Sequence, residues 1–339
     1  MFAAPLVSGI LFALAAGLMW GLVFVGPLLL PEYPAALQSF GRYLAFGLIA
    51  LPLAWFDRAK LKELSRADWI EALKLALVGN IVYYLFLASS IQRAGGPLPT
   101  MIIGTLPVVI AVTANLRRAA PGARVETPLA WSRLAPSLVL IALGIACVNQ
   151  VELEQLRRDP GADLARYALG ALLAACAVAC WTWYPLRNAE WLRAHPDRSP
   201  RGWATAQGLA TLPLALIGYG LTWAWFGLSG ATGAAASPPV FTMPFGPRPA
   251  EFLLLMFAIG LFASWLGTLC WNEASQRLPP TLSGQLIVFE TLAALTYAYA
   301  LRHSFPQVQT LVGIALLIGG VVWAVRSGPS DESADAHPN

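Results

Sequence analysis

The sequence predicts an all-α integral membrane protein with ten transmembrane helices, arranged as two inverted five-helix repeats. Three observations predict this fold class. First, 57% of the 339 residues are hydrophobic and only 12% are charged, about half of the roughly 25% charged residues typical of water-soluble domains. Second, ten apolar segments reach the length of about 20 residues that a helix needs to cross a bilayer. Third, stretches of the second half resemble stretches of the first half in the same order.

The apolar segments give the predicted spans and domains. The spans cover residues 5–29, 34–55, 69–92, 98–116, 133–150, 166–187, 203–226, 251–272, 281–301 and 308–326. The first run lacks a preceding basic segment and is too long for a signal peptide, so we expect it to be a span. Residues 1–150 then form the first repeat, residues 151–326 the second, and the small polar residues 327–339 a disordered tail.

Basic residues between the spans predict the orientation. Loops 56–68, 117–133 and 187–202 are rich in arginine and lysine, whereas basic residues in the opposite loops are fewer and partly offset by acids. The richer side is expected to be cytoplasmic, which places both termini in the cytoplasm. Because the net charge of +4 comes from such loops, it does not indicate a nucleic acid partner. The expected partners are a lipid bilayer and a small-molecule substrate.

The internal repeat rests on two ungapped pairings. Residues 90–112 align with 274–296, which places Gln92 over Gln276, and residues 13–21 align with 174–182, which places Trp20 over Trp181. An odd number of spans in each half forces the halves into opposite orientations. Inverted repeats of this kind are typical of secondary transporters, whose substrate site lies at the membrane midplane between the halves. Channels also contain repeats, so the pattern favours transport over any one mechanism.

These features resemble a known family. Ten spans, "MWG" late in the first span, "FGRYLAFGL" in the second and the "LP" and "FET" pairs in the fourth and ninth are similar to the drug/metabolite transporter superfamily, EamA type. "LCWNEASQRLPP" most resembles the bacterial aromatic amino acid exporters. The resemblance implies a bacterial inner-membrane protein with a substrate cavity between spans one to four and six to nine, with spans five and ten at the periphery. Members often have Glu-Pro in the ninth span. Here Glu290-Thr291 stands in its place, so no proline can carry a kink there.

Other chemistry has little support in the sequence. There is no GxxxxGK[ST] loop for ATP, and the histidines lie in loops and the tail. The four cysteines fall inside apolar runs without further ligands, so we expect neither a metal site nor a cofactor. An intramembrane enzyme is the alternative from another class, but it would need paired acids or metal ligands at depth.

Glu290 is the first candidate for a substrate-binding residue. It lies about nine residues into its span, or roughly 13 Å at 1.5 Å per residue. An ionised side chain there costs on the order of 3 kcal/mol or more if it faces lipid, so it should face a cavity or a partner. It could bind the ammonium group of an amino acid or take up a proton during transport. The structural alternative is a neutral acid that is hydrogen-bonded to a neighbouring helix.

Arg42 is the second charge at depth, with Gln38 one turn earlier on the same face. The guanidinium could bind a substrate carboxylate or pair with Glu290. The structural alternatives are that Arg42 extends to the membrane interface or bonds backbone carbonyls at a helix end.

Other predicted site residues are aromatic or amide side chains deep in the spans, where rings could contact an apolar substrate group or simply pack together. They are Trp20, Asn80, Tyr83, Tyr84, Trp181, Trp265 and Asn272. At i, i+3 and i+4 spacing, Asn80, Tyr83 and Tyr84 are expected to share one helix face. Tryptophans near span ends should form the interfacial belt. These are Trp55, Trp69, Trp131, Trp191, Trp203 and Trp323.

Prolines near the fourth and ninth spans are candidate gate positions, because proline removes a helix hydrogen bond and permits bending. They are Pro97, Pro99, Pro107, Pro279 and Pro280, of which Pro107 is expected to interrupt the fourth helix. At a helix start, proline is equally good punctuation. The small residues "GIALLIGG" of the last span favour close packing, either within the bundle or in a homodimer.

Together these features predict a transporter rather than an enzyme. It would export a small amphipathic metabolite, in the first place an aromatic or other hydrophobic amino acid, by alternating access. Coupling to protons through Glu290 and facilitated movement down the substrate gradient both fit. Export of another metabolite or of a drug-like cation is the alternative within the superfamily.

Overall fold

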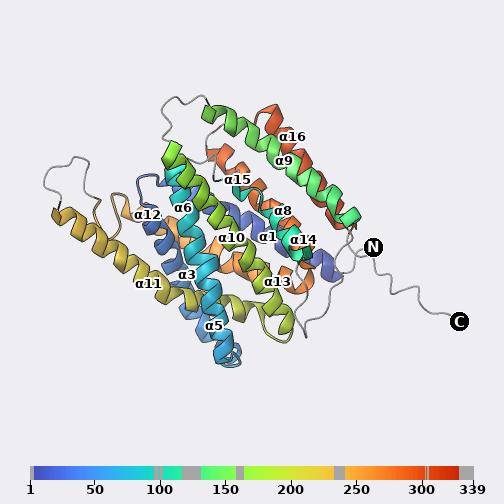
Figure 1. Cartoon of the computed structure of the whole chain (residues 1–339). Helices are drawn as coiled ribbons and strands as arrows, with labels where there is room; N and C mark the ends of the chain where they lie inside the picture. Colours follow the sequence, from blue (N-terminus) through green and yellow to red (C-terminus); the bar gives the residue numbers. More distant parts are fainter. Residues whose placement is uncertain are drawn as a thin grey trace.

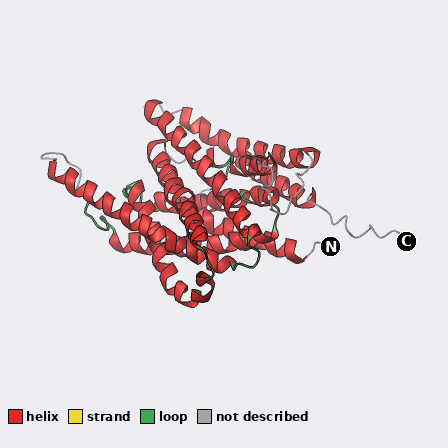
Figure 2. Ribbon diagram, turned by 60° about the horizontal axis from the view of Figure 1, so that its bottom comes forward, coloured by secondary structure: helices red, strands yellow, loops and turns green. Residues whose placement is uncertain are grey.

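The structure is a computed structural model that describes residues 4–94, 99, 102–116, 131–157, 164–232, 241–301, 303 and 305–327. All regular structure in these residues is helical, and no strand occurs among them (Figure 2). The prediction of an all-α fold is therefore confirmed for the described part of the chain.

The helices of the first half follow the predicted spans one to five. In chain order they are α1 (Ala4–Gly21), the 3₁₀ turn η1 (Leu22–Phe24), α2 (Val25–Leu29), α3 (Ala35–Phe56), α4 (Arg58–Lys62), α5 (Arg66–Leu75), the π-helix η2 (Ala76–Val82), α6 (Tyr83–Ala94), α8 (Leu106–Leu116) and α9 (Trp131–Arg157). The elements α1, η1 and α2 form one continuous rod, and so do α5, η2 and α6.

The helices of the second half follow spans six to ten. They are α10 (Leu164–Ala194), α11 (Pro200–Thr232), α12 (Pro249–Ile259), the π-helix η3 (Gly260–Leu266), α13 (Gly267–Arg277), α14 (Pro280–Leu286), α15 (Val288–Leu301) and α16 (Val308–Ser327). The elements α12, η3 and α13 again form one rod.

Seven helical rods among the described residues are long and apolar enough to cross a membrane. Three shorter apolar helices, Leu106–Leu116, Trp131–Cys147 and Val308–Ala324, coincide with the remaining predicted spans. Each predicted segment thus contains a helix, while crossing by all ten stays a prediction. Several helices extend past the predicted ends, because a helix stops at a cap or a proline rather than where the apolar run ends.

The helices pack in pairs that join the two halves. α9 and α16 lie side by side along one edge of the bundle, and α11 lies near the opposite edge against α3 (Figure 1). Between these edges α1 contacts α13 and α15, α10 contacts α6, and α8 contacts α14. The start of α1 and the end of α16 lie on the same side of the bundle (Figures 1 and 2).

Glycines at matched positions of the two halves make matched contacts. In the register of the pairing that contains Trp20, Gly9 falls over Gly170. A Cβ atom on Gly9 would lie 2.8 Å from Leu278, the C-cap of α13, and one on Gly170 would lie 2.6 Å from Ala94 of α6. In the register of the other pairing, Ala94 in turn falls over Leu278. The contact between α1 and α13 is therefore repeated between α10 and α6.

The α9–α16 pair shows the same correspondence within a single contact. A Cβ atom on Gly144 of α9 would lie 2.9 Å from Leu317 of α16, and one on Gly320 of α16 would lie 2.7 Å from Ile141 of α9. Ile141 precedes Gly144 by the same interval as Leu317 precedes Gly320. Each helix thus presents the same motif to the other. The small residues of the last span pack within the chain at these points, and a homodimer stays a prediction.

The π-helices η2 and η3 also occupy matched places. Each is seven residues long, and the register that places Gln92 over Gln276 places Ala76 over Gly260. π-Helical turns in α-helices are rare and often occur at functional sites. They change the helix periodicity, and Asn80 lies within the first of them.

The fourth and ninth spans are both interrupted. A turn at Gly104 and Thr105 precedes α8, and Pro107 is the second residue of α8. Proline lacks the N–H that would bond the carbonyl four residues earlier, here that of Ile103, so a helix breaks on the N-terminal side of the proline. The predicted interruption at Pro107 is therefore confirmed. In the ninth span, Ile287 separates α14 from α15 without any proline.

Candidate substrate-binding site

Glu290 lies in the first turn of α15, just after the break at Ile287. It is 3% exposed, so it faces the interior of the bundle. Gly17 of α1 allows this approach, because a Cβ atom there would lie only 3.0 Å from the Glu290 backbone nitrogen. The carboxylate lies beside Arg42 and Trp181. Its Oε2 atom accepts no hydrogen bond from the described residues.

Arg42 of α3 is 5% exposed, so it does not extend to the membrane interface. Its Nε donates to the Ser264 hydroxyl of η3 at 3.0 Å. The guanidinium lies over the rings of Tyr43 and Tyr84, 4.8 Å from each centroid. Such cation–π contacts stabilise a desolvated cation by about 2 kcal/mol. One nitrogen, Nη1, is buried and has no partner among the described residues.

The bundle thus encloses two opposite charges, each with one unsatisfied polar atom. Both act electrostatically on the hydroxyl of Tyr83, which places the three side chains in one neighbourhood. A buried charge with unsatisfied hydrogen-bonding capacity is unfavourable unless something supplies the partner. The unsatisfied atoms of Glu290 and Arg42 are therefore the feature of this region that calls for a functional explanation.

Five aromatic residues form a continuous ring cluster next to these charges: Trp20, Tyr83, Trp181, Tyr184 and Trp271. Trp181 stacks on Tyr83 with centroids 4.6 Å apart and on Tyr184 at 5.0 Å. Trp20 contacts both Trp181 and Trp271 at 5.1 Å. The indole N–H of Trp271 is buried without an acceptor among the described residues, whereas the indole of Trp181 lies beside the Glu290 carboxylate. The cluster joins α1, α6, α10 and α13 through ring contacts.

Three further predicted residues have contacts of their own within the bundle. Asn80, in η2, donates to Thr211 of α11 at 3.0 Å. The Tyr84 hydroxyl donates to the Val23 carbonyl at 3.2 Å, where the 3₁₀ turn η1 interrupts α1. Asn80, Tyr83 and Tyr84 therefore contact α11, α10 and η1, respectively, and a shared helix face stays a prediction.

The Gln38 amide bonds the backbone of the loop before α3, and no hydrogen bond joins it to Glu290 or Arg42 among the described contacts. Its Nε2 donates to the carbonyls of Leu30 and Tyr33, each at 2.9 Å. Gln92, which the repeat pairs with Gln276, donates to the same Tyr33 carbonyl at 2.9 Å. Gln276 makes the corresponding contact in the second half, to the Arg198 carbonyl in the loop before α11.

Trp265 and Asn272 lie outside the ring cluster. The indole N–H of Trp265 donates to Thr205 of α11 at 3.4 Å. Asn272 accepts from Asn188 of α10 at 2.8 Å and donates to the Pro200 carbonyl at 3.2 Å. These contacts tie α13 to α10 and α11.

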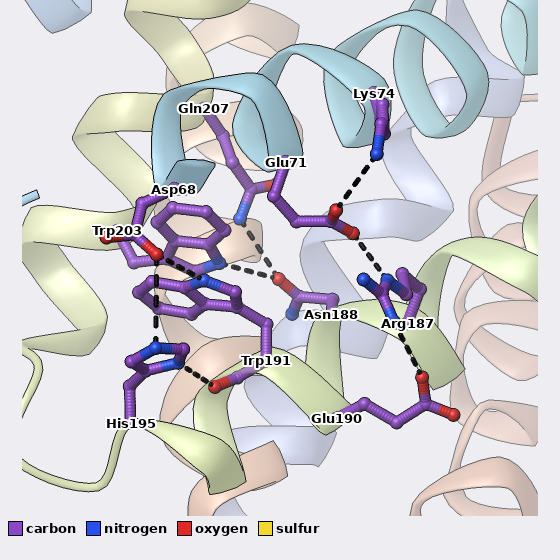
Figure 3. Close-up of polar contacts among 10 residues, drawn as sticks. All are labelled: Asp68, Glu71, Lys74, Arg187, Asn188, Glu190, Trp191, His195, Trp203 and Gln207. Atoms are coloured by element: carbon purple, nitrogen blue, oxygen red, sulfur yellow. Dashed lines mark hydrogen bonds and ion pairs between the residues drawn. The ribbon is translucent and has the colours of Figure 1, made fainter. Parts of the chain in front are cut away.

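Sequence analysis missed the polar network that continues from Asn188. Its Oδ1 accepts from Trp203 at 2.9 Å and from Gln207 at 3.1 Å (Figure 3). Gln207 also accepts from the Tyr184 hydroxyl at 2.9 Å, so the network reaches the ring cluster. Gln207, an amide side chain inside the apolar run of the seventh span, was the signal that could have revealed it; Asn188 lies just beyond the predicted end of the sixth span.

One end of the bundle is closed by ion pairs around α5 and α10. Asp68 accepts from the Trp191 indole at 3.0 Å and lies 3.9 Å from His195 (Figure 3). Glu71 pairs with both Arg187 and Lys74 (Figure 3). At the same end, other pairs connect residues 57–63 with residues 198–201: Asp57 with Arg201 and Glu63 with Arg198.

Two tryptophans at this end differ from the prediction. Trp191 stacks on Trp203 with centroids 3.5 Å apart, and the two are 7% and 1% exposed. They are thus core residues, and their assignment to a lipid-facing belt is wrong. Local sequence could not show this, because interfacial and buried tryptophans both stand at span ends.

The opposite end is closed mainly by Arg248. Its guanidinium binds Glu32 and Glu251 at 2.7 Å, and its backbone N–H donates to the Tyr33 hydroxyl at 2.7 Å. The hydrogen bond with Glu32 raises the pKa of Arg248. The Tyr33 ring stacks on Phe252 of α12 with centroids 4.9 Å apart.

Two of the predicted gate prolines begin a helix: Pro279 is the N-cap of α14 and Pro280 its first residue. Pro99 is buried, and Pro97 lies outside the described residues. Their role in gating stays a prediction. In the part of the chain that the structure describes, no group of three or more His, Cys, Asp or Glu residues could hold a metal ion.

Known proteins that are similar to this chain identify its family. Residues 7–122 match the EamA-like transporter family. Over 324 residues the chain is 55% identical to "Inner membrane protein YtfF" of Escherichia coli (strain K12), covering 96% of this chain and 97% of that protein. This chain belongs to the EamA-like transporter family. A protein of known crystal structure superimposes with a TM-score of 0.65 at 18% identity, covering 94% of this chain and 97% of that one. That likeness shows a shared fold.

Family membership confirms the resemblance to the drug/metabolite transporter superfamily and favours a transporter over an enzyme. The apolar helices and the relative together indicate a multi-pass inner-membrane protein. The likeness to aromatic amino acid exporters and the orientation of the termini stay predictions.

Proposed function

We propose that this EamA-family protein exports a small amphipathic metabolite, in the first place an aromatic or other hydrophobic amino acid. The observation that carries the proposal is the pair of half-satisfied charges, Glu290 and Arg42, beside the ring cluster. A zwitterionic amino acid offers an ammonium group to Glu290 and a carboxylate to Arg42. Its apolar side chain would lie against the rings, where Trp271 adds an N–H group that has no acceptor among the described residues.

The architecture proposed for this transport is ten spans in two inverted halves, with both termini in the cytoplasm. The matched glycine contacts, the matched π-helices and the self-matched α9–α16 pair support it. Inverted halves give alternating access by movement of one half against the other around a central site. The two ends, one closed around Asp68 and Glu71 and the other around Arg248, would open in turn.

The transport proposal is tested by counterflow in proteoliposomes loaded with unlabelled phenylalanine. Uptake of labelled phenylalanine above that of protein-free vesicles is expected. Unlabelled amino acids of different side chains, added in competition, would rank the substrates. Absence of exchange for every amino acid in the panel would contradict the amino acid assignment.

A drug-like cation is the second candidate, because Glu290 and the ring cluster alone would suit one. The buried positive charge of Arg42 disfavours it. Competition separates the two: phenylalanine should compete with its own labelled form better than phenethylamine, which has the same ring and ammonium group but no carboxylate.

A further inference from the structure

An apolar groove lies on the outside of the bundle, between α3 and the α12–η3 rod. Its volume is about 820 Å³, within the range of roughly 300–1,000 Å³ for small-molecule pockets. Leu44, Leu48 and Ile49 of α3 form one wall, and Leu253 and Phe257 of α12 belong to the other. The groove is separate from the charges and rings of the candidate substrate site.

The groove presents no free polar side-chain atom. Of its lining residues, Tyr219 and Trp265 carry polar atoms, and both use them within the protein. The Tyr219 hydroxyl donates to the Pro244 carbonyl at 2.6 Å, and the Trp265 N–H donates to Thr205 at 3.4 Å. An occupant therefore contacts almost only apolar side chains. A zwitterion would lose its hydration here without gaining hydrogen bonds, so it is excluded from this site.

The walls of the groove continue the surface that faces the bilayer. Leu48, Leu253 and Phe257 at its walls are 57%, 47% and 53% exposed. Along α3 the lining extends from Gly41 to Leu53, or roughly 18 Å at 1.5 Å per residue. One leaflet contributes about half of the roughly 30 Å hydrocarbon core, so the groove matches the length of one extended lipid chain.

The floor of the groove is a tight contact between the two helices. A Cβ atom on Gly41 would lie 2.7 Å from Phe252 and 3.1 Å from Met256. These two side chains line the groove and contact α3 at Gly41, the residue before Arg42. An occupant of the groove would add apolar contacts to the layer that separates Arg42 from the bilayer.

We propose that this groove is a binding site for one acyl chain of a membrane phospholipid. The chain is held by burial of apolar surface alone, so the site selects for hydrocarbon and not for a headgroup. It differs from the general lipid-facing surface by being concave, and a lipid in it should exchange more slowly with the surrounding lipid.

The test uses the full chain with its four cysteines replaced by alanine and one cysteine introduced for a bimane label. Ile49→Cys places the label in the groove, and Leu143→Cys on α9, which is 51% exposed, provides the matched control on open surface. The labelled proteins are reconstituted with phospholipid that carries bromine on its acyl chains, which quenches the label. They are then diluted into bromine-free lipid.

Quenching at Ile49→Cys should fade about tenfold more slowly than at Leu143→Cys. Adding Leu48→Phe to fill part of the groove should bring the two rates together. Equal rates without Leu48→Phe would overturn the proposal. So would the absence of any quenching at Ile49→Cys alone, since a second copy or another protein would then cover the groove. Because no transport is measured, the result is independent of the proposed substrate.

Discussion

The two halves of the molecule share a backbone plan but differ in chemistry at the centre. The glycine contacts and the π-helices recur at matched positions. When the halves are aligned in the same registers, Glu290 aligns with Leu106 and Arg42 aligns with Trp203. Tyr83, which stacks on Trp181, falls over Gly267, which packs against Trp20 instead. The repeat thus determines how the helices pack against one another. The charged and aromatic side chains of the site come from positions at which the two halves differ.

The largest effect is expected at the acid that has no counterpart. Glu290→Gln keeps the shape of the side chain but removes its charge, so counterflow of phenylalanine should fall by about 10²-fold, as for the loss of one buried charged partner. Size-exclusion chromatography should show the same amount of folded membrane protein as for the wild type. Glu154→Gln, the same change at an exposed acid of α9, should leave counterflow near wild type. A wild-type counterflow rate in Glu290→Gln would show that the carboxylate is not required for transport.

A smaller effect is expected at the second charge. Arg42→Lys keeps the positive charge but loses the planar fork that suits a carboxylate, so the half-saturating phenylalanine concentration should rise about tenfold. Competition by phenethylamine, which has no carboxylate, should change little. An equal loss for both compounds would show that Arg42 supports the fold rather than the substrate carboxylate.

The matched glycines allow a test of the shared backbone plan. Gly144→Val and Gly320→Val should destabilise the α9–α16 contact by similar amounts, about 1–3 kcal/mol each for overpacking. Thermal unfolding in one detergent would measure both. Gly319→Val, next along α16, is the control, because nothing lies within 4 Å of a Cβ atom there. Strongly unequal losses at Gly144 and Gly320 would contradict a two-fold related contact.

The smallest effect on transport is expected at Trp203, the counterpart of Arg42. Trp203→Phe removes the N–H that donates to Asn188, while Gln207 still donates to the same oxygen. Loss of the hydrogen bond should cost about 1 kcal/mol of unfolding free energy, and the smaller ring adds the cost of a cavity beside Trp191. Counterflow should stay near wild type. A loss of transport as large as that of Arg42→Lys would show that both matched positions serve the site.

The sequence predicted the helices well and the site in part. Apolar length identified segments that all contain helices, because membrane spans must be apolar and must satisfy their own backbone. The depth of Glu290 and Arg42 in apolar runs correctly indicated that both face inward. The partners of Gln38, Trp203 and Asn188 could not be predicted, since each bonds a residue on another helix or loop.

By itself, the sequence determined the membrane environment, the helical fold and the pair of charges that lipid would not tolerate. Those features depend on the composition and spacing of single segments. The tertiary structure alone decided that Ser264 and two tyrosine rings hold Arg42, that five rings join into one cluster, and that Trp191 and Trp203 are core residues. The physical reason is that a buried polar or aromatic group is defined by its neighbours, and here those neighbours come from helices far apart in the chain.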